Sequence, residues 1–136
     1  MGTCDSEDRL RDWPQTTRKG NMCFDTDTLQ SAAHFYQQAL TLALCNYPND
    51  EDFNHSIIAI ILGYHNLAEL RIQQGNLSDA QFNLHTAHQF ILDELNKTGS
   101  DLKKMSLLRA SNKTQFAIQS FNKDYSTTFL KKEKTQ

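Results

Sequence analysis

Apolar residues recur along most of the chain at intervals of three and four positions, which places them on one face of a helix. The first clear stripe lies between Leu29 and Leu44. Asp27 or Thr26 can cap this helix, because a short side-chain oxygen accepts a hydrogen bond from a first-turn amide. Pro48 ends it, because proline lacks an amide hydrogen and disfavours helix in the preceding residue. The stripe consists of Leu29, Ala32, Ala33, Tyr36, Leu40, Ala43 and Leu44.

A second helix is predicted from Phe53 to Gln74, and its apolar surface is wide. A helix that is apolar over so much of its circumference must be covered from two directions. The alternative is a buried strand over the run 57–62; it is disfavoured because the helical period continues past this run and no other segment could pair with it. The main stripe is Ile57, Ile60, Ile61, Tyr64, Leu67 and Ala68, and Ile58, Leu62 and Ile72 extend it.

Two further helices follow, separated by glycine-containing turns. Gly75 can adopt the left-handed conformation that ends a helix, and Ser78 with Gln81 resembles a capping box for the next helix, which extends to about Asn96. Ser100 can cap the final helix. The inner face of the third helix is Leu77, Ala80, Leu84, Ala87, Ile91 and Leu95, and that of the final helix is Leu107, Ala110, Thr114, Ala117, Phe121 and Tyr125.

The N-terminal part of the chain is weakly patterned. Trp13 and Pro14 suggest the start of a short first helix, because proline is tolerated in a first turn. We therefore predict a loosely ordered segment at 1–12, a single helical domain at 13–129 and a frayed basic tail at 130–136.

The turn around Gly75 and its flanking helices resemble the tetratricopeptide repeat, in which antiparallel helices approach each other at alanines. Arg71 departs from the aromatic residue usual in that motif, and Leu92 from its closing proline. The region from about residue 13 to 95 also resembles a family of short, uncharacterised bacterial proteins. The repeat positions are Tyr64, Leu67, Ala68, Gly75, Leu77, Ala80, Leu84 and Ala87, with a second, partial match at Leu29, Ala32, Tyr36, Ala39 and Leu40.

The resemblance implies an all-α, right-handed stack of antiparallel helix pairs, with four or five helices and a C-terminal helix that caps the stack. Each pair exposes an apolar face that it cannot cover alone, so the pairs must stack. If the final helix does not seal the stack, a second copy of the chain could, which would give a homodimer.

The resemblance also implies a protein-interaction or adaptor module with a concave groove. The residues expected to line this groove are Leu62, His65, Asn66, Glu69 and Ile72. His65 and Glu69 occupy positions where carboxylate-binding repeats carry lysine and asparagine, so that ligand class is not expected. An acidic, partly apolar groove favours a basic or amphipathic helix. The alternatives are that the C-terminal helix covers this face, or that the helices hold a small molecule or peptide as a sensor.

The charge distribution adds an argument about partners. The 136 residues carry a net charge of −2, but residues 24–101 carry ten acids and two bases, and residues 102–136 carry eight bases and two acids. Such asymmetry bears on association rather than on fold. The basic segment interleaves with Phe116, Phe121, Tyr125 and Phe129, a pattern that can bind nucleic acid. Because only one of its eight bases is arginine and the body is acidic, we expect the segment to pack on the acidic helices, and we do not expect nucleic acid as a partner.

The sequence contains no motif that supports an enzymatic or metal-binding function. The chain has no phosphate-binding loop, nucleophile elbow or His-Glu-x-x-His motif, so we predict no enzymatic activity and no cofactor. His85 and His88 lie one helical turn apart and His65 could approach them, but a zinc site needs three or four ligands, and we predict no metal site.

Sequence features also bear on the compartment. No apolar run approaches the ~18 residues of a membrane span, and residues 1–13 are polar, so we expect a cytoplasmic protein without a membrane partner. Cys4, Cys23 and Cys45 are scattered and odd in number, which is typical of reduced thiols.

Overall fold

The computed structural model describes residues 13–47 and 53–135, and only the backbone of residues 46 and 126–135. Within these ranges the chain is all-α. The helices are α2 (Trp13–Asp25), α3 (Leu29–Asn46), α4 (Phe53–Gln73), α5 (Leu77–Lys97) and α6 (Asp101–Thr135). This confirms the predicted class and helix number, including the weakly patterned first helix. Segment 1–12 lies outside the described residues, and the α6 backbone continues as helix into the region expected to fray.

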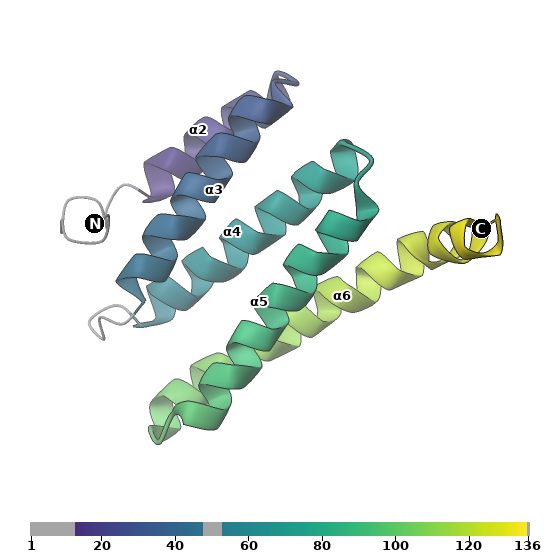
Figure 1. Cartoon of the computed structure of the whole chain (residues 1–136). Coiled ribbons are helices and arrows are strands. Elements are labelled where there is room, and N and C mark those ends of the chain that lie inside the picture. Colours follow the sequence, from purple (N-terminus) through teal and green to yellow (C-terminus); the bar gives the residue numbers. More distant parts are fainter. Residues whose placement is uncertain (1–12, 48–52, 136) are drawn as a thin grey trace.

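Each helix packs on the one before it, and α4 also contacts α2 and α6 (Figure 1). Tyr36 and Leu40 of α3 lie in a core with Ile60 and Leu70 of α4. On the other side of α4, Ile57, Ile61, Ile91 and Leu107 form a second cluster that joins α4, α5 and α6, and Ala68, Ala80, Leu84 and Phe121 form a third. The prediction that this helix is covered from two directions is therefore confirmed.

The approach of α3 to α4 explains a glycine inside a helix. A methyl group at Gly63 would lie 2.9 Å from Leu40 Cβ and 3.2 Å from Leu40 Cα. Rotation of the leucine side chain moves neither of these atoms. The glycine costs the helix about 1 kcal/mol in propensity, and in exchange the two backbones approach closely.

The start of α3 differs from the prediction. Its N-cap residue is Thr28, whose side chain makes no capping hydrogen bond. Asp27 instead has a left-handed backbone, with φ 66°. The hydroxyl of Thr26 donates to the carbonyl oxygen of Met22 at 3.0 Å. Both predicted caps are thus engaged in closing the preceding helix.

The N-cap of α5 also differs from the prediction, by two residues. The N-cap is Asn76, whose Oδ1 accepts a hydrogen bond from the Asp79 amide at 3.1 Å. Helix α5 therefore begins before Ser78, which was predicted to cap it. Two neighbouring predictions are confirmed: Gly75 has φ 77°, and Ser100 Oγ accepts from the Lys103 amide at 3.3 Å.

Helix α6 docks through the predicted apolar stripe. Leu107, Ala110, Thr114 and Phe121 are buried. Thr114 Oγ1 lies 2.7 Å from Nδ1 of His88 on α5. The ion pairs between described side chains are Arg71–Asp79 and Lys97–Glu94, neither of which involves α6. Lys103 of α6 places its Nζ atom 5.1 Å from the centroid of the Phe53 ring on α4, so a cation–π contact accompanies the apolar packing of α6 on the preceding helices.

The cysteines correct one expectation. Cys45 is disulfide-bonded, whereas Cys23 is a free thiol. The expectation of reduced thiols is therefore wrong for Cys45.

Candidate functional site

A groove runs along α4 on the side where α6 lies beside it. Helix α6 does not close this face completely: it forms a second wall and leaves two adjoining cavities, which share His65. We call the two cavities together the α4–α6 groove. Four of the five residues expected from the sequence line it. Leu62 lies in the first cavity, Glu69 and Ile72 lie in the second, and Asn66 lines neither.

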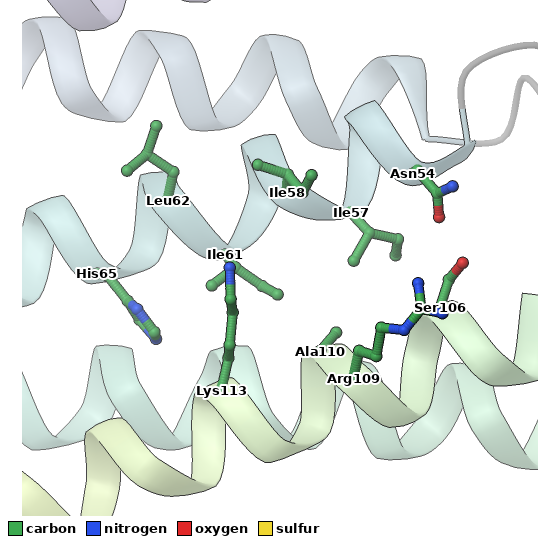
Figure 2. A pocket seen from close by; sticks show the side chains of 10 residues that line it. All are labelled: Asn54, Ile57, Ile58, Ile61, Leu62, His65, Ser106, Arg109, Ala110 and Lys113. Atoms are coloured by element: carbon green, nitrogen blue, oxygen red, sulfur yellow. The ribbon is translucent and has the colours of Figure 1, made fainter.

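The first cavity has a volume of about 460 Å³ and an aliphatic wall contributed by α4. Figure 2 shows Ile57 and Ile61 directed from α4 toward α6, and Lys113 rising from α6 toward them. Its formally charged lining residues are Arg109 and Lys113, so we call it the cationic cavity. The full lining is Asn54, Ile57, Ile58, Ile61, Leu62, His65, Ser106, Arg109, Ala110 and Lys113.

The second cavity has a volume of about 390 Å³ and continues the groove toward the C-terminal end of α4. Its formally charged lining residues are Glu69 and Asp124, so we call it the acidic cavity. The full lining is His65, Ala68, Glu69, Ile72, Leu84, Phe116, Ala117, Ser120, Phe121, Asp124 and Tyr125.

His65 stands where the two cavities meet. Burial, and secondarily the positive charge of Lys113, lower the pKa of its imidazole below the usual 6.5. Its Nε2 atom is buried and has no hydrogen-bond partner among the described residues. Leaving such an atom unpaired costs about 1–3 kcal/mol. The imidazole is therefore neutral at physiological pH. Its position is fixed by packing rather than by a hydrogen bond to Nε2.

Large apolar side chains remain exposed along the groove. Ile58 is 53% exposed, Leu62 is 37% exposed and Phe116 is 69% exposed. Contiguous exposed apolar surface with a polar rim is typical of interaction sites. The wall that α6 contributes was not identified from the sequence. The sequence shows the basic residues of α6. It does not show which of them lie opposite α4, because that depends on how two helices that are distant in the sequence pack against each other.

Other candidate sites have simpler structural explanations. Within residues 13–47 and 53–135, no group of three or more His, Cys, Asp or Glu side chains is placed to hold a metal ion. His88 hydrogen-bonds Thr114 and is partly buried. Of the aromatic residues in the basic segment, Phe121 is buried in the core, which removes it from any base-stacking surface. No helix in the described part of the chain is long and apolar enough to cross a membrane.

Comparison with known proteins gives a family. Residues 11–135 match the model of a family described as a protein of unknown function, DUF2753. No curated protein and no solved structure matches the chain. The family match agrees with the expected resemblance to small, uncharacterised proteins, and it extends over the final helix as well.

Proposed function

This chain belongs to the DUF2753 family, whose function is unknown, and we propose that it is a non-catalytic protein-interaction module. In this proposal the α4–α6 groove binds an amphipathic helix of a partner protein. The observation that carries the proposal is the exposed aliphatic surface of α4 in the groove, with Ile58 and Leu62, beside charged residues that lie mostly on α6.

The dimensions of the groove suit a helix. Asn54 and Ile72 mark its ends on α4 and are 18 positions apart. At 1.5 Å per residue they are separated by roughly 27 Å, the length of about five helical turns. A partner helix lying there would cover Leu62 with its apolar face and keep its polar face in water, which is a common mode of peptide recognition.

The arrangement of the helices supports a repeat-like scaffold for this role. Among the alternate helices, α4 contacts both α2 and α6 and therefore lies between them. We propose that these helices form the concave side of a tetratricopeptide-like stack. Helix α6 is then both the cap of the stack and one wall of the groove.

The experiment is affinity isolation of partners from extracts of the source cells with three forms of the full chain. Leu62→Asp places a charge on the groove wall, and Phe82→Asp places the same charge on an exposed α5 residue that lines neither cavity. Far-UV circular dichroism must show the same helix content in all three forms. We expect partners that wild type and Phe82→Asp retain and Leu62→Asp loses. The same partner list for all three forms would remove the groove from the function.

A second candidate is a sensor of small molecules, and the cationic cavity is the observation that favours it. Apolar walls with a few convergent polar groups are typical of ligand sites. If this candidate holds, a low-molecular-weight fraction of the extract raises the melting temperature of the wild type and does not raise that of Leu62→Asp.

A further inference from the structure

Building on the proposed function, we propose that the partner helix is segregated in charge along its length. An acidic side chain of the partner occupies the cationic cavity, and a basic side chain occupies the acidic cavity. The sequence alone suggested an acidic, partly apolar groove, and the wall contributed by α6 adds two basic residues to it.

The cationic cavity selects an acidic group. Arg109 and Lys113 are the formally charged residues of its lining. They are four positions apart on α6, so their side chains are neighbours that repel each other. Neither makes an ion pair with a described side chain. A carboxylate placed between them relieves the repulsion, and Arg109 can bind it through two parallel hydrogen bonds.

The aliphatic wall restricts the carboxylate further. Ile57 and Ile61 line this cavity and point from α4 toward the helix that carries the two cations (Figure 2). The acidic side chain of the partner therefore carries its charge at the end of a short apolar stem. Glutamate fits, because its methylenes can pack on the isoleucines while its carboxylate reaches the two cations. His65 has a buried and unpaired Nε2 at the inner end of the same cavity, and it adds no negative charge.

The acidic cavity has the opposite preference. Glu69 on α4 and Asp124 on α6 face it from its two walls. Phe116 also lines it and is exposed, so a lysine or arginine stem can pack there while its charge meets the carboxylates. A uniformly basic helix would satisfy this cavity and place cations against Arg109 and Lys113.

Two probes of equal length and opposite charge test this chemistry on the full chain. They are octanoate and octylammonium, titrated separately at low salt and followed by NMR shifts of the Ile61 methyl groups in the cationic cavity and the Ile72 methyl groups in the acidic cavity. We expect octanoate to act first at Ile61 and octylammonium first at Ile72. A charge-assisted hydrogen bond corresponds to a preference of about tenfold in affinity at each position.

Charge reversal provides the second step. Lys113→Glu should abolish the octanoate preference at Ile61, and Glu69→Lys should abolish the octylammonium preference at Ile72. Lys104→Glu is the matched control, because Lys104 is exposed on α6 and lines neither cavity. Equal response of Ile61 to both probes in the wild type would overturn the charge assignment, as would an equal effect of Lys104→Glu and Lys113→Glu.

The source of the charged groups is tested with the partner itself. Lys113→Glu and Glu69→Lys should each lose a partner that wild type and Lys104→Glu retain. If the probes separate as expected but both variants keep the partner, the cavities serve free amphiphiles and the charge-segregated helix is wrong. If Leu62→Asp also keeps the partner, the proposed function fails as well, so the two failures are distinguishable.

Discussion

Replacing Gly63 by alanine should destabilise the protein, although the same change stabilises most helices. Alanine at a helix interior gains about 1 kcal/mol over glycine in propensity. Here the new methyl group would lie 2.9 Å from Leu40 Cβ and 3.2 Å from Leu40 Cα. These atoms can move away only if α3 moves, and such overpacking costs about 1–3 kcal/mol. The balance is a net loss of about 1 kcal/mol.

The assay is urea unfolding followed by circular dichroism, with Gly99→Ala as the matched control. A methyl group at Gly99 would have no atom within 4 Å, so this variant should be unchanged or more stable by up to about 1 kcal/mol. If Gly63→Ala is as stable as the wild type, or more stable, the close packing of α3 on α4 is wrong.

Three other predictions test the packing, a helix cap and a buried histidine. Leu107→Ala should lower the free energy of unfolding by about 2–5 kcal/mol because it opens a cavity, while Leu108→Ala, at an exposed position, should change it little. Asn76→Ala should lower the free energy of unfolding by about 1 kcal/mol through loss of the α5 cap, and Ser78→Ala should change it little. If Ser78→Ala has the larger effect, Ser78 is the cap, as the sequence suggested. Because the pKa of His65 is lowered in the fold, only the unfolded chain binds its proton just below the usual 6.5, so stability should fall as pH decreases through that value. Urea unfolding at several pH values should show a smaller fall for His65→Phe.

The periodic features of the fold could be read from the sequence. The stripe containing Ile57, Ile61 and Leu67 is buried as its helical spacing predicted, whereas Ile58 and Leu62, which widened the apolar surface to a second side, remain exposed. The stripe containing Leu107 and Phe121 predicted the docking face of α6 in the same way. These predictions hold because burial acts on many positions at once.

The caps could not be read as reliably, because each depends on the backbone conformation of one or two residues. Asp27 was a plausible cap for α3, but its left-handed φ places it in the connection instead. Ser78 was a plausible cap for α5, but Asn76, two residues earlier, accepts the hydrogen bond from the Asp79 amide, and the helix starts at Leu77.

Only one of the two walls of the candidate site could be predicted from the sequence. Leu62, His65 and Glu69 could be assigned to one face of α4, since their spacing is helical. The opposite wall, with Arg109 and Lys113, depends on the offset between α4 and α6, and no local pattern specifies that offset. The sign of the charge in the cationic cavity follows from this offset, which is why the sequence alone predicted an acidic, partly apolar groove.

The most direct test of the groove is site-specific cross-linking. A photo-reactive side chain is introduced at Leu62 in the groove and, in a separate protein, at Phe82 on α5, and both are irradiated in source-cell extract. The proposed function predicts a partner that cross-links at Leu62 and not at Phe82, through a segment whose sequence forms an amphipathic helix. Cross-linking of the same partner with equal yield at both positions, or at Phe82 alone, would contradict it.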